Sequence, residues 1–262
     1  MSMETEALYL DLLTRHSYAI LDRTGLYKES WHQTLPTISL VPRALRSDTQ
    51  KMPALLPLGY EVPYLEPLAE DLSAADENNS RSLISCLLTV PPETDPERLQ
   101  WHLTDRLVLR SPQGRAFLRY YDSRVFLHFD RILHPAQAMS LYGPVEQWTV
   151  RFQKDWITLP APDIADMQTV PLVWQVNASQ REGLDRVGTV NLALTYWREE
   201  VGRPFADLNE WRALAAKADA SIAQDQRRSP GTPEENLAWQ ARNRLLQIKD
   251  QTQASEEMNH GM

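Results

Sequence analysis

Prolines are concentrated in the first 162 of the 262 residues, and this unequal distribution limits the folds that the chain can adopt. Proline ends helices and is excluded from central strands, so short apolar runs between prolines indicate short strands and helices. After Pro160-Ala161-Pro162 the prolines thin out and helix-forming residues dominate. We therefore expect an α/β (α+β) fold with an N-terminal mixed α/β lobe over residues 1–160. A C-terminal helical lobe with a frayed tail would occupy residues 161–262.

Hydrophobic spacing predicts the elements of the first lobe. Leucines four residues apart follow Asp95-Pro96 and predict a helix over 96–106, because Asp caps helices and proline suits the first helical position. Prolines through residues 36–67 favour strands and extended loops, including a strand at 63–65. The other expected helices cover 4–15, 26–33, 122–133 and 134–142. The other expected strands cover 18–21, 83–90, 107–110, 115–121, 145–151 and 156–159.

Apolar faces predict longer helices in the second lobe. They cover residues 178–201, with a break near Gly188, and residues 205–224. Thr232-Pro233-Glu234-Glu235 matches a capping box and predicts a further helix over 233–249.

Composition excludes several classes of protein. The single cysteine, Cys86, excludes an internal disulfide and a cysteine cage for a metal, and its apolar neighbours predict a buried side chain. The net charge of −8 opposes binding to nucleic acid or to an anionic membrane. No apolar run approaches the roughly 20 residues that span a bilayer, and the first residues lack a basic signal region. We therefore expect a cytoplasmic protein.

Residues 101–160 depart from the acidic balance, since they hold eight basic and five acidic residues. All but one of the basic residues are arginine, which suits carboxylate pairing better than diffuse attraction of phosphate. The segment from Arg119 to Val125 reads Arg-Tyr-Tyr-Asp-Ser-Arg-Val. In a structural interpretation, Asp122 caps a helix and pairs with Arg119 or Arg124 while the tyrosines pack. In a functional interpretation, the segment is a recognition surface, because Arg and Tyr are enriched at interface hot spots.

No catalytic signature is present: the sequence lacks a nucleophile elbow, a dinucleotide-binding loop, a phosphate loop and a zinc-protease motif. His102, His128 and His134 have spacings that match no standard metal signature, so we expect hydrogen-bonded or surface histidines. Most of the eight tryptophans should lie in the core or in contacts between lobes. A protein that docks partners would also expose some of them.

Several short motifs follow one another in a specific order. They are Tyr18-Ala19-Ile20-Leu21-Asp22, Pro63-Tyr64-Leu65, an apolar strand with a short amphipathic helix, the segment from Gly114 to Val125, and Gly143-Pro144-Val145-Glu146-Gln147-Trp148. Together, over residues of about 18–160, they resemble the effector chaperone/adaptor family of bacterial type VI secretion systems. The family hallmark reads Arg-Phe-Tyr-Asp-Pro-Arg-Val, followed by Gly-Pro and a tryptophan. Here Tyr120 stands in place of the phenylalanine and Ser123 in place of the proline.

The resemblance implies a non-enzymatic adaptor that needs no cofactor and no metal. Such a protein holds a toxic effector in the producing cell and loads it onto the spike protein VgrG. The implied partners are therefore the N-terminal region of an effector protein and VgrG. The hallmark positions in this chain, with a role in folding or in contact, are Arg119, Tyr121, Asp122, Arg124 and Trp148. We expect the α/β lobe to bind the effector, because it holds the Arg/Tyr segment.

Two other functions remain open. A small hydrolase would use Asp122 with His128 or His102, and these side chains would then converge in a concave pocket with perturbed pKa values. An immunity-type protein would bind the toxic domain of an effector rather than its N-terminal region.

Overall fold

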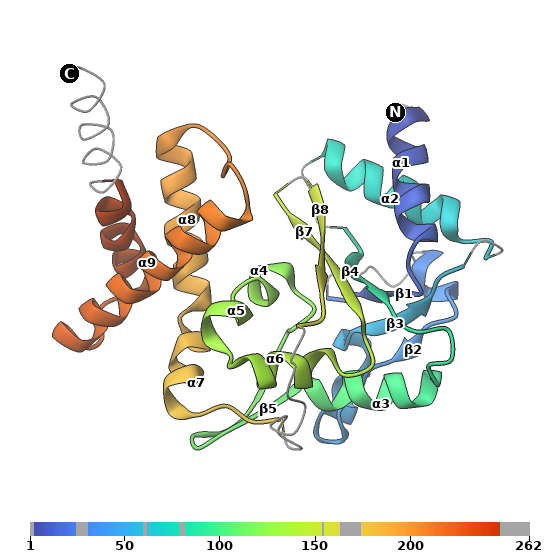
Figure 1. The fold of residues 1–262 in the computed structure, drawn as a ribbon, viewed down its shortest axis with the longest axis horizontal. Coiled ribbons are helices and arrows are strands. Elements are labelled where there is room, and N and C mark those ends of the chain that lie inside the picture. The colour runs from blue at the N-terminus through green and yellow to red at the C-terminus, as the bar shows by residue number, and fades with distance from the viewer. Residues whose placement is uncertain are drawn as a thin grey trace. The chain divides into compact units, whose positions relative to one another are not determined.

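The computed structural model describes residues 3–24, 31–59, 62–78, 82–153, 155–162 and 174–246. It has the expected α/β (α+β) class, with strands mostly in the N-terminal part and helices in the C-terminal part (Figure 1). The chain divides into two compact units, Met1–Phe126 with His134–Val176, and Leu127–Leu133 with Asn177–Met262. The sequence analysis placed the boundary at residue 160, whereas this division falls after Val176 and assigns an earlier short segment to the second unit.

The strands of the first unit form an antiparallel sheet in the order β2-β3-β1-β4-β7-β8. Their bounds are β1 (Tyr18–Leu21), β2 (Ile38–Ser39), β3 (Ala54–Pro57), β4 (Ile84–Thr89), β7 (Gln147–Phe152) and β8 (Asp155–Pro160). A separate hairpin pairs β5 (Val108–Ser111) with β6 (Gly114–Phe117) around the predicted turn. The second hairpin strand ends at Phe117, which leaves Arg119 to Tyr121 in a loop rather than in the strand expected to reach residue 121.

The helices of the first unit are α1 (Met3–Thr14), α2 (Leu65–Glu77), α3 (Pro96–Arg106), α4 (Ser123–Phe126) and α6 (Pro135–Tyr142), with the 3-10 helices η1 (Trp31–Thr34) and η2 (Arg43–Lys51). The predicted bounds of α3 are confirmed, and the Asp95 carboxylate accepts a hydrogen bond from the Glu97 N–H at 3.1 Å. Part of the helix expected over 26–33 and the tail 250–262 lie outside the described residues.

The strand expected at 63–65 is wrong, because Leu65 is the first residue of α2. Leu65, Leu68 and Leu72 share the buried face of this helix. Pro67 stands in its first turn, where a proline is tolerated because the backbone N–H groups there have no partner within the helix. The proline content of this segment therefore does not exclude a helix.

Helices cover both faces of the sheet (Figure 1). One face packs against α1 and α2 and carries the strand residues Ala19, Leu21, Leu56 and Leu87. Alternate residues of the same strands point to the other face, where Trp148 contacts Phe126 of α4 and Tyr142 of α6. Cys86 belongs to this second face and is fully buried, as expected, and burial raises the pKa of its thiol well above the ordinary value.

The second unit is helical, with α5 (Phe129–Ile132), α7 (Ala178–Asp185), α8 (Val187–Val201), α9 (Leu208–Arg228) and a helix over residues 234–246. The break between α7 and α8 falls at Arg186, near Gly188 as expected. Arg131 and Arg186 both pair with Asp219, at 2.8 and 2.7 Å. Among the residues of the described ranges, no helix has the length and apolar character that crossing a membrane requires.

Candidate functional site

The hallmark positions lie together in the first unit with Asp22 and Tyr120. We call this set the motif cluster: Asp22, Arg119, Tyr120, Tyr121, Asp122, Arg124 and Trp148. The cluster has a charged part and an aromatic part, and the loop from Arg119 to Asp122 belongs to both. It brings together residues from the end of β1, from the loop before α4 and from β7.

In the charged part, each aspartate has an arginine partner. The Arg119 Nη2 atom donates to Asp22 Oδ2 at 2.7 Å, and the Asp22 side chain is only 1% exposed. Asp122 accepts two hydrogen bonds from the Arg124 guanidinium, at 3.0 and 2.7 Å, and one from the Arg124 backbone N–H at 3.0 Å. Burial alone would raise the pKa of Asp122, but the hydrogen bonds and charge of Arg124, together with Arg119, lower it below its ordinary value. Asp122 therefore caps the start of α4 as a carboxylate.

In the aromatic part, Trp148 is fully buried and surrounded by rings. The Tyr120 ring meets it edge-on at a centroid distance of 5.6 Å, and the Phe126 ring lies at 5.0 Å. The Tyr120 hydroxyl donates to the carbonyl oxygen of Leu103 on α3 at 2.9 Å. Tyr121 is also buried, which raises the pKa of its hydroxyl to about 12. These contacts give the aromatic hallmark residues a packing role.

The glycine of the Gly-Pro motif, Gly143, has a structural role at the end of α6. Gly143 ends α6 with φ +56° and ψ −117°, a conformation that essentially only glycine adopts. A Cβ atom at this position would lie 2.2 to 2.7 Å from ring atoms of His102. The His102 Nε2 atom in turn donates to the carbonyl oxygen of Leu141 at 2.9 Å, and burial lowers the pKa of this histidine to about 4. The motif thus allows α6 to pack closely on α3.

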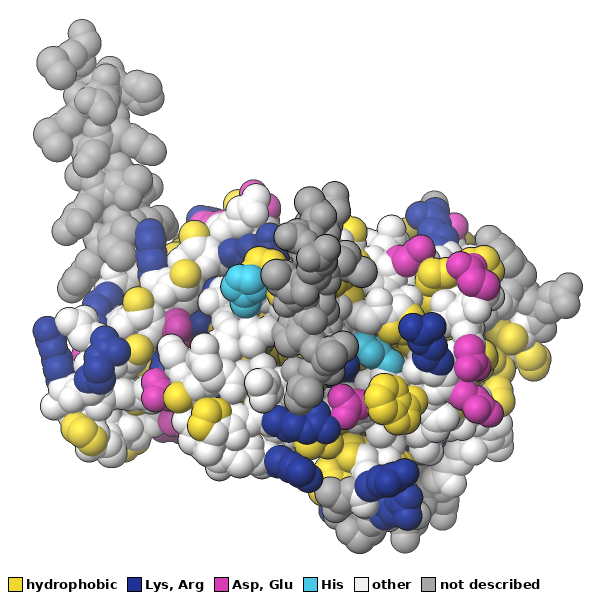
Figure 2. All heavy atoms as spheres, turned by 60° about the horizontal axis from the view of Figure 1, so that its bottom comes forward, with side chains coloured by type: hydrophobic (Ala, Val, Ile, Leu, Met, Phe, Trp, Pro, Cys, Tyr) yellow, Lys and Arg dark blue, Asp and Glu magenta, His cyan; other side chains and the backbone are white. Residues whose placement is uncertain are grey.

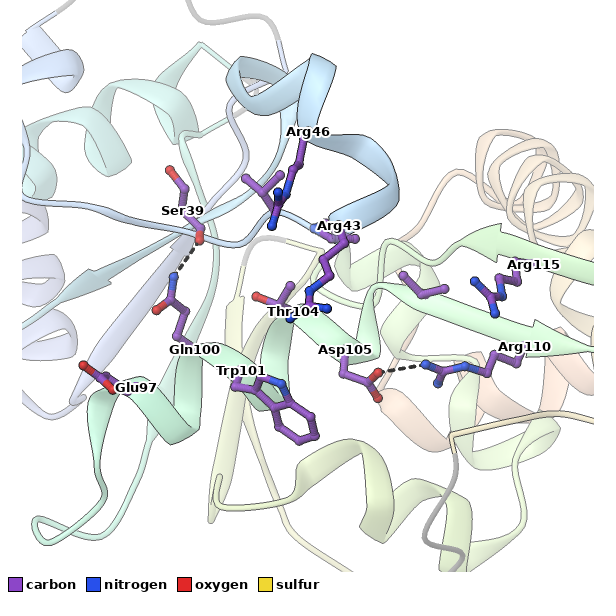
Figure 3. A pocket seen from close by; sticks show the side chains of 13 residues that line it. Ser39, Arg43, Arg46, Glu97, Gln100, Trp101, Thr104, Asp105, Arg110 and Arg115 are labelled. Carbon is purple, nitrogen blue, oxygen red and sulfur yellow. Dashed lines mark hydrogen bonds and ion pairs between the residues drawn. The ribbon is translucent and has the colours of Figure 1, made fainter.

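A groove of about 730 Å³ lies next to the motif cluster in the same unit, and we call it the arginine groove. Arg43 and Arg46 come from η2 and Arg110 and Arg115 from the hairpin, while α3 contributes Trp101, Thr104 and Asp105 (Figure 3). The Trp101 side chain is 72% exposed. In the space-filling view of this face, Lys and Arg side chains gather around hydrophobic ones in its lower part (Figure 2).

The groove has an excess of positive charge. Its four arginines face two carboxylates, those of Glu97 and Asp105. Asp105 already pairs with Arg110 at 3.0 Å and with Arg106, a mostly buried residue outside the groove lining, at 3.2 Å. No residue in the described ranges forms an ion pair with Arg43, Arg46 or Arg115.

Three hydrogen bonds, one of them from Tyr120 of the motif cluster, hold the walls of the groove in place. Tyr120 anchors α3 through its hydrogen bond to Leu103, and the Leu118 N–H donates to the carbonyl oxygen of Leu107 at 2.9 Å, which joins the end of the hairpin to the end of α3. On the other side, Gln100 of α3 donates to the carbonyl oxygen of Ser39 at 3.0 Å. The exposed groove is therefore built on a buried framework that contains the hallmark residues.

Sequence reasoning selected the motif cluster but missed the arginine groove. The arginine excess of residues 101–160 already included Arg110 and Arg115. Trp101 could also have been found, because it lies two residues from both Leu99 and Leu103 and therefore falls outside the buried face of α3. Arg43 and Arg46 offered no signal, since nothing in the sequence relates residues 43–51 to this helix.

The geometry does not support the hydrolase alternative. Asp122 is paired with Arg124 and Arg119. His102 donates to Leu141, while the His128 ring bonds to Asn191 and Arg131 in the second unit. Burial lowers the pKa of His128 to about 4. Within the described ranges, His, Cys, Asp and Glu side chains form no group of three or more that could hold a metal ion.

The chain matches no protein-family model, and searches of curated proteins and of solved structures gave no match either. The resemblance to the adaptor family therefore depends on the order of the motifs along the chain and on the residues that they contain.

Proposed function

We propose that the protein is a non-enzymatic adaptor that binds the N-terminal region of a type VI secretion effector and loads it onto the VgrG spike protein in the cytoplasm. One observation carries the proposal: three of the motifs that resemble the adaptor family, which lie far apart in the sequence, meet in a single cluster. Arg119 bonds to Asp22 of the first motif, and Tyr120 packs on Trp148 of the last. An accidental match of short motifs would have no reason to bring them together in space.

The motif cluster supports the partner surface rather than forming it. Tyr120, Tyr121 and Trp148 are buried, whereas the side chain of Arg124 is 66% exposed. An adaptor of this kind needs exposed side chains that bind and release partners, and the arginine groove in the first unit provides them. This location favours the first unit as the one that binds the effector.

The experiment that tests the proposal is co-purification from the native bacterium. A tagged full-length chain is expressed at its natural level, and the bound proteins are identified by mass spectrometry. We expect one large effector together with VgrG, and neither protein in a parallel purification from cells that carry the tag alone. Recovery of neither partner with the tagged chain would contradict the proposal.

A second measurement separates the adaptor from an immunity-type protein. The N-terminal region of the recovered effector and its toxic domain are expressed separately and mixed with the full-length chain. We expect binding to the N-terminal region. Binding to the toxic domain alone would instead identify an immunity protein.

A further inference from the structure

We propose that the arginine groove binds an extended acidic segment of a partner protein, with Trp101 as its apolar contact. The inference rests on the proposed function in one respect, namely that the effector carries this segment. The chemistry of the segment itself follows from the side chains that line the groove.

Charge complementarity points to carboxylates. Arg43, Arg46 and Arg115 present guanidinium groups that no described residue neutralises with an ion pair. A guanidinium group offers two parallel N–H donors, which match the two oxygens of a carboxylate. The Arg110 Nη2 atom donates to Asp105 Oδ1 at 3.0 Å, so an arginine–carboxylate pair is already formed within the groove. Acidic side chains of a partner can form ion pairs with the remaining arginines.

The arrangement of the arginines favours a chain over a small acid. Arg43 and Arg46 come from η2, Arg115 comes from the hairpin, and Trp101 comes from α3 (Figure 3). A segment that lies along the groove can place acidic side chains on the arginines of η2 and of the hairpin and an apolar side chain on Trp101. Trp and Arg are the residue types that most often dominate binding energy at protein interfaces.

A nucleic acid fits the groove less well than a peptide. The carboxylates of Glu97 and Asp105 line the same groove and would oppose closely spaced phosphates. The net charge of the chain, −8, also opposes the approach of a polyanion. Single-stranded nucleic acids are typically bound by several stacking aromatic side chains along a basic path, whereas the lining residues of this groove include one aromatic residue, Trp101.

The first test is a selection from displayed random peptides of about 12 residues, which extend over roughly 40 Å. The full-length protein is the bait, and the full-length variant with Arg43→Glu and Arg46→Glu is used to remove peptides that bind elsewhere. We expect the enriched sequences to contain an excess of Asp and Glu together with a large apolar residue. No enrichment, or enrichment without acidic residues, would overturn the inference.

The second test measures the affinity of the most enriched peptide by fluorescence anisotropy. We expect Arg43→Glu with Arg46→Glu to weaken binding by at least about tenfold and Trp101→Ala to weaken it as well. The matched controls are Arg227→Glu with Arg228→Glu on α9, for the double charge change, and Arg98→Glu, an exposed position on α3 outside the groove lining. An equal loss of peptide affinity in the control variants would contradict a specific binding site in the groove.

The same assay compares the peptide with a single-stranded DNA oligonucleotide. Tighter binding of the oligonucleotide than of the peptide would show that the groove binds nucleic acid instead.

Failure of this inference and failure of the proposed function give different results. If the unaltered protein co-purifies with the effector and VgrG, and the groove variants do so equally well, the groove inference fails while the adaptor function stands. If acidic peptides bind the groove but the unaltered protein recovers neither partner, the adaptor function fails while the groove inference stands. Loss of one partner, and not of the other, in the groove variants identifies the protein that carries the acidic segment.

Discussion

The guanidinium group of Arg119 lies 2.7 Å from the carboxylate of Asp22, a residue 97 positions earlier in the chain. Asp22 follows β1 directly, and its side chain also accepts hydrogen bonds from the backbone and hydroxyl groups of Thr24, at 3.0 and 2.6 Å. The contact therefore fixes the loop before α4 against the central part of the sheet. It joins the first and the most distinctive of the motifs on which the family resemblance depends.

Removing this arginine should destabilise the protein. In Arg119→Met the nearly buried Asp22 carboxylate loses its charged partner, and hydrogen bonds to charged groups contribute about 1.5–3 kcal/mol. Because a third of the Arg119 side chain is exposed, we expect the lower part of this range for the loss in free energy of unfolding, measured by urea denaturation. The control is Arg115→Met, an exposed arginine of the hairpin, with an expected change of less than about 0.5 kcal/mol. Equal effects of the two substitutions would show that the Asp22 contact does not stabilise the fold.

Gly143→Ala should be among the most destabilising small substitutions. The new Cβ would meet the His102 ring within 2.7 Å, and the backbone conformation is one that alanine rarely adopts. Gly202→Ala is the control, because Gly202 has φ +69° but nothing within 4 Å of the added atom. We expect about 1 kcal/mol for Gly202→Ala, from backbone strain alone, and a clearly larger loss for Gly143→Ala. Thermal or urea unfolding of both variants compares them, and similar losses would contradict the steric explanation.

Truncation of two tryptophans should change the stability of the protein by very different amounts. Trp148→Ala leaves a cavity in a closely packed aromatic cluster and should cost about 3–5 kcal/mol of stability. Trp101→Ala removes a side chain that is 72% exposed, so the free energy of unfolding should change by less than about 0.5 kcal/mol. Binding of the selected acidic peptide should nevertheless weaken in Trp101→Ala. A large loss of stability in Trp101→Ala would place this side chain in the core and remove its role in the groove.

Acid should destabilise the protein between pH 6.5 and about 4. Burial lowers the pKa of His102 and of His128 to about 4, against about 6.5 in the unfolded chain. In this window the unfolded state binds protons that the folded state does not, so the free energy of unfolding falls as the pH is lowered. Each histidine contributes up to about 1.4 kcal/mol per pH unit. His102→Gln, which keeps a donor for the Leu141 carbonyl, should remove about one proton from the slope in urea titrations at several pH values. An unchanged slope would show that His102 is not the titrating group.

Local signals in the sequence were enough to predict elements whose ends depend on their own residues. Asp95, Pro96 and the leucines of α3 specify its start and its buried face, and both were predicted correctly. The role of Asp122 as a cap also follows from its own neighbours. The strand expected at 63–65 is wrong, although the prolines of this segment favour extended chain. The buried leucine face of α2 outweighs that preference.

Features that depend on distant segments could not be predicted. Residues 122–133 have a continuous apolar pattern that predicts one helix, but α4 and α5 belong to different units. The arginine groove likewise needs η2 to lie beside α3, and the contact that marks this, from Gln100 to Ser39, spans 61 positions. Hydrophobic periodicity predicts which face of a helix or strand is buried, but it does not predict which other element packs against that face. Which elements pack against one another depends on the packing of the whole unit.

The assignment of Leu127–Leu133 to the second unit has a consequence for the order in which the protein forms during synthesis. The partners of His128 and Arg131 in that unit, Asn191 and Asp219, leave the ribosome about 60 to 90 residues later. At translation rates of roughly 5–20 residues per second, this delay lasts several seconds. During that time α5 lacks its neighbour α7, and the His128 ring lacks the Trp211 ring of α9, which lies at a centroid distance of 4.7 Å. The newly made chain therefore presents a short apolar segment to chaperones before its own last third is available to enclose it.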